Sequence, residues 1–386
     1  MTEREFECIV VGLGGLGSGA AYWLSRRFGS GVLGLEQFEL GHDRGASQDH
    51  SRIIRLSYHT PFYVELAKRA YEAWADVEAE LGERLIIETG GLDLWPAGAA
   101  IPMEDYTSSL SASHVPFEIL DAGEVMQRWP QWRLEEDVVG LFQERGGIAP
   151  AARCNEAHRR LARAHGATLL DGVRVIDVTD DGRGEITLST DDETRYVSRA
   201  VVLCADAWAN ELLSHLGTRV PLEVTQEQVT YFSPVEADSF APDVFPIWIW
   251  NDEPCFYGFP TFGEAGPKVA QDCGGRPVTP ESRTFDPDPD NFDRVREFTA
   301  QHLPGAAGPV IATKTCLYTL TPDRDFVIDA VPGHPNVFVA LGAAHGFKFA
   351  SVIGRILAHL AADERTETDL GPFRLDRFEL QARQIV

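Results

Sequence analysis

The sequence feature that most constrains the fold is a stretch near the start of the chain, FECIVVGLGGLGSGAAYWLSRRFGSGVLGLEQFE. Residues 8–11 form a continuous apolar run, as expected for a strand that is covered on both faces. A glycine-rich turn follows, and we expect a helix over residues 18–28 and a second apolar strand over residues 32–35. This order predicts a β-α-β unit and therefore an α/β fold.

Three glycines in the turn, Gly12, Gly14 and Gly17, have the GxGxxG spacing. In such turns the first glycine permits a tight bend, the second lets the backbone approach a pyrophosphate, and the third lets the helix pack closely on the strand. The helix N-terminus favours phosphate, and Glu36 at the end of the second strand can accept both hydroxyls of a ribose. A turn that serves packing alone is the alternative. The complete unit favours a dinucleotide, either NAD or FAD, and Glu36 disfavours NADP because it would repel the 2′-phosphate.

Length, net charge and cysteine content restrict the number of domains, the possible partners and the cellular location of the protein. A chain of 386 residues is too long for one compact core and suits two domains. The net charge of −25 at pH 7 repels nucleic acids and anionic membranes, so neither is an expected partner. The six cysteines show no CxxC pairing, so we expect neither a disulfide framework nor a metal site. The N-terminus lacks signal-peptide features and no apolar stretch reaches the roughly 18 residues of a membrane span, which favours a soluble protein of the cytoplasm.

The remaining segments follow two patterns. Residues 61–82 and 152–165 carry apolar positions at helical spacing and predict helices. From residue 221 to about 309 the chain changes to short strands and proline-rich loops, which indicates a mixed sheet. We therefore predict a discontinuous dinucleotide-binding domain with an inserted domain of mixed β-sheet and helices. The first domain is expected to comprise residues 1–85, 150–220 and 310–386, and the second residues 86–149 and 221–309.

Four local stretches carry a resemblance to a known family: GLGGLGSGAAYWL with Glu36, SRIIRLSY, YGFPTFGEAGPK, and the pair KTCLYTLTPDRDFVID and GAAHGFKF. The last pair is the most specific. Over nearly its whole length the chain resembles the monomeric sarcosine oxidase and N-methyltryptophan oxidase family of flavin amine oxidases, which have the D-amino acid oxidase-like fold. The resemblance implies that the first domain is a Rossmann-like domain that binds FAD and that the inserted domain binds the substrate.

The resemblance implies that Cys316, in TKTCLYTLTPD, carries FAD covalently through a thioether. A cysteine without this context is more often a small buried apolar residue. Attachment needs a thiolate, so we expect a cationic neighbourhood around Cys316, to which Tyr318 and Lys348 contribute.

Two arginines in the SRIIR stretch have roles in the family that it resembles. Arg52 matches the arginine that lies against the flavin ring, and Arg55 matches the arginine that binds the substrate carboxylate, for which the guanidinium fork is well suited. Lys348 is similar to the second cation of that carboxylate site. Two arginines that form surface salt bridges are the alternative interpretation of an RxxR pair.

Lys268 matches the lysine that serves oxygen activation, where positive charge stabilises developing superoxide; a solvated loop lysine is the alternative. The N–H groups of the GAAHGFKF loop are expected to face the flavin and to stabilise its reduced anion. Tyr257 and Tyr318 are expected to line the pocket, although isolated tyrosines are usually core residues. With Arg52 and Lys268 they form the expected catalytic group. The expected cofactor-binding residues are Gly12, Gly14, Gly17, Glu36, Ser51, Arg52, Val175, Cys316, Gly342, His345, Gly346, Phe347 and Lys348.

Several positions depart from the family pattern. Asp272 stands where relatives usually have a histidine, Asp206 where they have a glycine before Ala-Trp, and Glu227 where they have a basic residue. Ser47 and Gln48 replace a pair of histidines. These changes leave the FAD prediction intact and put the substrate in doubt. One hypothesis is that Asp272 or Glu227 binds a cationic or polar part of the substrate.

The predicted function is the oxidation of the C–N bond of a secondary or cyclic amino acid by FAD and dioxygen, with an imine and hydrogen peroxide as products. We expect a monomer whose partners are the small amino acid and dioxygen. A flavin-dependent dehydrogenase of a hydroxy acid or sugar with another electron acceptor is the first alternative, and a non-catalytic binding module is the second. An NAD dehydrogenase is a weaker one, because nothing after residue 220 resembles a nicotinamide catalytic domain.

Overall fold

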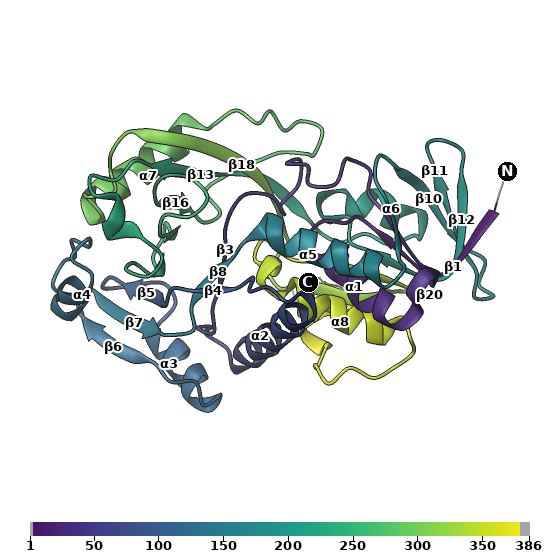
Figure 1. The fold of residues 1–386 in the computed structure, drawn as a ribbon, viewed down its shortest axis with the longest axis horizontal. Coiled ribbons are helices and arrows are strands. Elements are labelled where there is room, and N and C mark those ends of the chain that lie inside the picture. Colours follow the sequence, from purple (N-terminus) through teal and green to yellow (C-terminus); the bar gives the residue numbers. More distant parts are fainter. Residues whose placement is uncertain (1–2, 379–386) are drawn as a thin grey trace, which may run out of the picture.

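The computed structural model of the protein describes residues 3–378 and contains two large sheets with helices packed between and around them (Figure 1). The eight-stranded sheet lies at the end that carries the N-terminus, and the nine-stranded sheet lies at the opposite end. A small sheet of β3 (Arg52–Ile54), β8 (Gly147–Ala149) and β4 (Ile87–Glu88) lies between them. The predicted α/β fold with an inserted mixed sheet is confirmed.

The eight-stranded sheet is built around β1 (Glu3–Val11), in which the apolar run of residues 8–11 is buried. β1 pairs in parallel with β2 (Val32–Leu35) on one side and with β12 (Arg195–Leu203) on the other. β9 (Thr168–Leu170) and β20 (His334–Leu341) extend this parallel part. The antiparallel strands are β10 (Val175–Asp180), β11 (Ile186–Thr190) and β19 (Val327–Val331). The first two apolar runs of the chain therefore become neighbouring strands, as predicted.

The turn after β1 and the first turn of α1 (Gly15–Phe28) each contain a glycine with no room for a side chain. Gly12 has a φ of +87°, and a Cβ atom there would lie 2.5 Å from the carbonyl oxygen of Cys204. A Cβ atom on Gly17 would lie 1.7 Å from the carbonyl oxygen of Gly12. Glycine is therefore required at both positions, first for the bend and then for the close approach of α1 to the sheet.

A layer of helices lies beside this sheet. α1 contacts α8 (Ala350–Leu360) and α5 (Ala151–Ala164), and α8 also contacts α2 (Pro61–Leu81). The backbones of α1 and α8 touch, since a Cβ atom on Gly354 would lie 2.3 Å from the carbonyl carbon of Gly19. Both helices predicted over residues 61–82 and 152–165 are thus present, shifted by no more than one residue.

Local signals define both ends of α2. The Thr60 side chain accepts a hydrogen bond from the backbone N–H of Tyr63, and Pro61 occupies the first helical position. Gly82 ends the helix in the left-handed conformation, with a φ of +75°. Its buried face packs against α8.

The nine-stranded sheet contains the strands of the inserted region. Its order is β17-β13-β16-β15-β14-β5-β7-β6, and β18 pairs with β13. The strands are β5 (Gly91–Trp95), β6 (Glu118–Asp121), β7 (Val139–Gln143), β13 (Glu223–Phe232), β14 (Ile247–Trp250), β15 (Phe256–Phe259), β16 (Lys268–Gln271), β17 (Arg276–Pro277) and β18 (Val310–Leu320). The α-helices of this region are α3 (Met103–Ala112), α4 (Ala122–Arg128) and α7 (Pro289–His302), whereas α6 (Ala209–His215) packs against β10 of the other sheet.

Two features of this region differ from expectation. We placed residues 310–386 in the dinucleotide-binding domain, but β18 pairs with β13 along its length and so belongs to the nine-stranded sheet. The apolar pattern of a strand does not show which sheet it joins, which explains the error. α7 was also missed, because it lies in a region where strands and loops were expected. The rest of the domain division stays a prediction.

None of the helices within residues 3–378 is both long and apolar enough to span a bilayer.

Candidate active site

A cavity of about 860 Å³ is lined by residues of both large sheets, a size typical of cofactor and ligand sites. The glycine turn and Glu36 line one end, and side chains of β3, β15, β16 and β18 line the other. All the predicted site residues line the cavity except Gly17, which packs against Gly12 instead. The structure thus brings together residues that are more than 300 positions apart in the sequence.

The dinucleotide end is organised by Glu36. Its carboxylate accepts hydrogen bonds from the backbone N–H groups of Leu13, at 2.8 Å, and Phe38, at 3.2 Å, and lies 3.4 Å from Nε2 of His42. Burial raises the pKa of Glu36, but the hydrogen bonds from His42 and from the two backbone groups outweigh this and lower it overall. Glu36 is therefore ionised at the cavity wall, which suits an acceptor for ribose hydroxyls.

The SRIIR segment, residues 51–55, contributes side chains to the cavity wall that could bind a cofactor. Ser51 lines the cavity, and its hydroxyl is buried without a hydrogen-bond partner among the described residues. Arg52 also lines the cavity, and its guanidinium donates to the carbonyl oxygens of Ser51, at 2.9 Å, and Ala46, at 2.8 Å. A buried hydroxyl without a partner is costly, so a ligand that bonds to Ser51 would remove that cost. The glycine cradle, Glu36 and Ser51 together fit FAD.

Cys316 lies on β18 and faces the same cavity. Burial raises the pKa of its thiol to about 11, while Arg52, Arg283 and Lys268 act in the opposite direction. We expected Tyr318 and Lys348 to contribute positive charge around Cys316, but the cations that act on its thiol are these three residues. Arg283 was missed because it lies in a loop 33 positions earlier, where it donates hydrogen bonds to Thr315 and to the backbone of Arg44.

Arg55 and Lys348 lie close together at the other end of the cavity. Nη1 of Arg55 lies 2.8 Å from Oδ1 of Asp93, a fully buried carboxylate that also accepts a hydrogen bond from Ser57. Burial and, to a lesser extent, Arg55 lower the pKa of Lys348 to about 7, although Asp272 opposes the change. The ammonium group of Lys348 forms no hydrogen bond or ion pair with any described residue, so it is available to an anion.

Asp93 was missed by sequence reasoning. It occupies the middle of the apolar strand GLDLW, where every residue is buried. A buried carboxylate needs a cation or hydrogen-bond donor as its partner, so an aspartate in the middle of an apolar strand could have marked Asp93 as a site residue. Which cation would pair with it could not be read from the sequence, because Arg55 lies 38 positions earlier.

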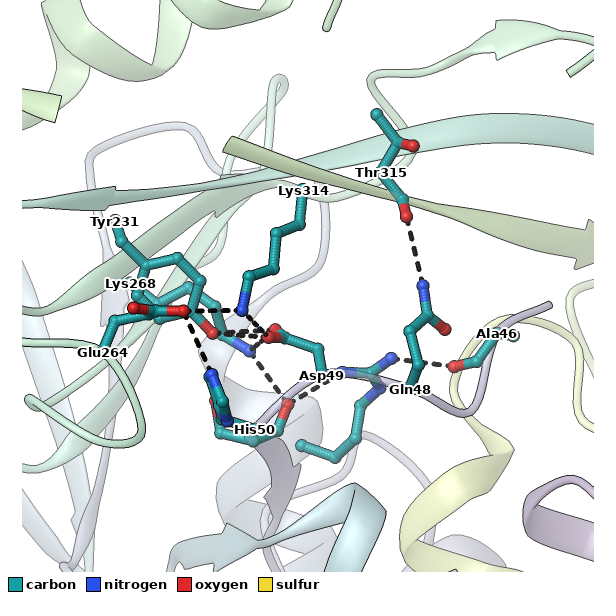
Figure 2. A network of polar contacts seen from close by, with 11 residues as sticks. Ala46, Gln48, Asp49, His50, Tyr231, Glu264, Lys268, Lys314 and Thr315 are labelled. Carbon is teal, nitrogen blue, oxygen red and sulfur yellow. Dashed lines mark hydrogen bonds and ion pairs between the residues drawn. The ribbon is translucent and has the colours of Figure 1, made fainter. Parts of the chain in front are cut away.

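Lys268 begins β16 and is buried at the cavity wall. Its ammonium group donates to Asp49, at 3.0 Å (Figure 2). It also donates to the carbonyl oxygen of Ser51, at 2.9 Å. The interpretation of Lys268 as a solvated loop lysine is therefore wrong. Asp49 was not among the predicted site residues.

Tyr257 of β15 and Tyr318 of β18 both line the cavity, and burial raises the pKa of each phenol. Neither group ionises near neutral pH. His345 lies in the loop before η4 (Gly346–Phe349), and its Nε2 lies 3.0 Å from the carbonyl oxygen of Arg324. Burial lowers the pKa of His345 to about 3, and Lys348 lowers it as well, so this histidine is neutral. It can position the loop as a hydrogen-bond donor.

The residues that depart from the family pattern occupy three different places. Asp272 lines the cavity and pairs with Arg324 at 2.8 Å. Asp206 also lines the cavity, and burial raises its pKa to about 6. Glu227 lies opposite Cys316 in the pairing of β13 with β18, and burial raises its pKa to about 7. The hypothesis that Glu227 or Asp272 contacts the substrate stays a prediction.

Comparison with known proteins agrees with this site. Residues 7–360 match the family model of the DAO proteins, described as FAD dependent oxidoreductases. The chain is 33% identical to monomeric sarcosine oxidase of a Bacillus species, over 99% of this chain and 100% of that protein, and 32% identical to human peroxisomal sarcosine oxidase, over 97% and 96%. Among solved structures, NikD, "an unusual amino acid oxidase essential for nikkomycin biosynthesis", matches with a TM-score of 0.84 and 26% identity, over 96% of this chain and 97% of that chain.

The match extends over most of the chain, and the glycine turn, the acid at the end of β2 and the cavity fit the cofactor that the family name gives. An NAD dehydrogenase and a non-catalytic module are thereby set aside. The chain belongs to the DAO family of FAD-dependent oxidoreductases.

Proposed function

We propose that this protein oxidises the C–N bond of a secondary or cyclic amino acid, such as an N-methyl amino acid, with FAD as the cofactor and dioxygen as the electron acceptor. The observation that carries the proposal is the unpaired ammonium group of Lys348 beside Arg55, in the same cavity as the dinucleotide turn. These two cations suit a carboxylate, and the names of the sarcosine oxidases and of NikD point to amino acids.

The side chains divide the work of such a reaction. Arg55 and Lys348 would hold the substrate carboxylate, and this orients the adjacent C–H bond. The substrate amine must lose its proton before oxidation, and nearby positive charge together with burial favours the neutral amine. FAD held in the cavity would supply the acceptor for a hydride equivalent and the route for the electrons to dioxygen, with hydrogen peroxide as the product. Lys268 would place positive charge where oxygen becomes negative, and water would hydrolyse the released imine.

The proposal includes a thioether between Cys316 and FAD. Cys316 faces the cavity, and three cations surround its thiol. Acid precipitation of the FAD-loaded protein tests this point, because a tethered flavin stays with the washed polypeptide. The Cys316→Ala variant should release its flavin under the same treatment. A monomer is also part of the proposal, supported by the bacterial relatives that are named monomeric sarcosine oxidases, and size-exclusion chromatography with light scattering checks it.

The function is tested by a panel of N-methyl, cyclic and primary amino acids, each assayed for hydrogen peroxide in air and for dye reduction under argon. We expect peroxide release with at least one N-methyl or cyclic amino acid. Dye reduction without peroxide would show a dehydrogenase instead, and a response to hydroxy acids or sugars alone would contradict the substrate class.

A further inference from the structure

Lysine is rare in this chain and is concentrated at the cavity. Among 34 basic residues only four are lysines, namely Lys68, Lys268, Lys314 and Lys348. Two of them line the cavity, and Lys314 lies two positions before Cys316 on β18. A guanidinium stays charged at every accessible pH, whereas the charge of an amine can be adjusted by its surroundings. The chain therefore has amines where adjustable charge would be useful, and the surroundings of Lys268 show how the adjustment is made.

Asp49 is the centre of these surroundings (Figure 2). Oδ2 of its carboxylate accepts from Lys268 at 3.0 Å, and Oδ1 accepts from Lys314 at 3.2 Å. The hydroxyl of Tyr231 donates to both oxygens, at 2.9 and 2.8 Å. Burial raises the pKa of Asp49, but Lys268 and Arg52 outweigh this and hold it below its usual range. Asp49 is therefore a buried anion shared by two ammonium groups.

Burial is the main influence that disfavours the charge of Lys268, and Asp49 is the main group that favours it. The charged or titratable groups that face it are Asp49 from the loop before β3, Arg52 from β3, Tyr231 from β13, and Lys314 and Cys316 from β18. Burial and Arg52 lower the pKa of Lys268 to about 8, and Asp49 opposes this change. The ring of Phe259 lies 4.2 Å from the ammonium nitrogen. Among the described residues, Asp49 is the only carboxylate in contact with Lys268.

Lys314 connects this site to the surface. Its ammonium group also pairs with Glu264 at 2.8 Å, and Glu264 lies 3.1 Å from Nε2 of His50. The Lys314 side chain is 35% exposed, compared with 2% for Lys268. The ion pair of Asp49 with Lys268 is therefore buried, whereas its ion pair with Lys314 is in partial contact with water.

We propose that Asp49 is a positioning residue for Lys268: its carboxylate keeps this ammonium group charged at the cavity wall, and Lys314 competes for the same carboxylate. The catalytic consequence rests on the proposed function, in which Lys268 supports the reaction with dioxygen. The electrostatic relation among the three residues does not depend on that function.

The proposal predicts opposite effects for two substitutions. Asp49→Asn removes the counter-charge but keeps the shape of the side chain, so Lys268 should lose its proton more readily. Asparagine also tolerates the left-handed backbone of this position, where φ is +79°. Lys314→Met removes a nearby cation and leaves the carboxylate to Lys268, which should then hold its proton more firmly. A purely structural role of the cluster would not produce shifts of opposite sign.

The first experiment measures the titration of Lys268 directly. The FAD-loaded protein is labelled with lysine carrying ¹³C at Cε, so that only four side-chain signals appear, and Lys268→Met assigns the signal of Lys268. The wild-type signal should titrate near pH 8. Asp49→Asn should lower this midpoint by about one pH unit or more, the range expected for loss of an adjacent opposite charge. Lys314→Met should raise it.

Lys68→Met is the matched control, because Lys68 pairs with Glu65 on the exposed face of α2 and should leave the Lys268 titration unchanged. The proposal is overturned if Asp49→Asn leaves the midpoint in place or if Lys314→Met lowers it. If Asp49→Asn does not fold, Lys314→Met alone decides, through the direction of its shift.

The second experiment connects the charge to the reaction. Enzyme reduced by its amino acid without oxygen is mixed with dioxygen at pH 7.5, and the return of the flavin absorbance is followed. Asp49→Asn should slow this step about tenfold while the reduction by substrate changes less than twofold, since the charge would act only on oxygen. If the lysine titration shifts as predicted and the oxygen step does not change, Asp49 still controls Lys268, and the role of Lys268 in the proposed function is wrong.

Discussion

Two sites in the cavity, one around Lys268 and one around Lys348, contain the same kinds of residue but pair them differently. Each site contains a buried lysine, a neighbouring arginine and a buried carboxylate. Around Lys268 the carboxylate of Asp49 pairs with the lysine itself, whereas near Lys348 the carboxylate of Asp93 pairs with Arg55. Burial lowers the pKa of both lysines, to about 8 for Lys268 and to about 7 for Lys348. The paired ammonium group can act as a fixed charge, and the unpaired one is free to bind an anion.

This difference assigns the two lysines to different tasks. The ammonium group of Lys268 already donates to Asp49 and to the carbonyl oxygen of Ser51, and displacing them to bind a substrate carboxylate would cost much of the binding energy. Arg55 is also paired, but its Nε has no partner among the described residues and can still donate. Lys348 has no such partner, and an incoming carboxylate supplies the missing charge. The comparison can be tested by removing one member of each pair and measuring what the remaining charge does.

The largest effect is expected from Arg55→Met. This change leaves the Asp93 carboxylate buried without its cation, and loss of one partner of a buried pair typically costs about 3–5 kcal/mol. Urea unfolding measures the loss, and the Michaelis constant for the amino acid should rise as well. The double variant Arg55→Met with Asp93→Asn should recover much of the stability and none of the substrate binding. If it also recovers binding, Arg55 does not contact the carboxylate.

The two lysines should respond in opposite ways to replacement by methionine. Lys268→Met leaves Asp49 short of one charged donor and should lower the free energy of unfolding by about 1–3 kcal/mol, the cost of an under-satisfied buried group. Lys348→Met leaves no carboxylate behind and removes an unpaired buried amine, so the protein should be equally stable or more stable. Urea unfolding at matched FAD content provides the comparison. A loss of stability in Lys348→Met would show that the Lys348 ammonium group does have a stabilising partner, which would contradict its description as unpaired.

The pH dependence of anion binding should follow Lys348. The pKa of Lys348 near 7 lies below that of an ordinary lysine, so the charged form is present below pH 7 and is lost as the pH rises. The inhibition constant of a simple carboxylate without an amine should therefore increase about tenfold per pH unit above pH 7. Lys348→Arg keeps its charge and should remove this dependence. A flat profile in the wild-type enzyme would assign the carboxylate to Arg55 alone.

Sequence reasoning found the parts of this site that depend on local signals. The glycine turn, the acid at Glu36 and the helix at α2 each lie within one continuous segment, and all three were predicted. The counter-ions were not predicted, because the partners of Asp49 and Asp93 lie 219 and 38 positions away in the chain. The assignment of β18 failed for the same reason, since strand pairing is set by tertiary contacts.

The smallest expected effect concerns Asp272. This residue directly follows β16, and its carboxylate raises the pKa of Lys348 and so favours the charged ammonium group. Asp272 already pairs with Arg324 at 2.8 Å and is partly exposed, so solvent weakens its influence. Asp272→Asn should lower the midpoint of the carboxylate-binding profile by less than one pH unit. Glu264→Gln should likewise lower the titration midpoint of Lys268 only slightly, because it acts through Lys314. A shift of more than one unit in Asp272→Asn would make Asp272 the true counter-ion of Lys348, and the contrast between a paired and an unpaired lysine would then fail.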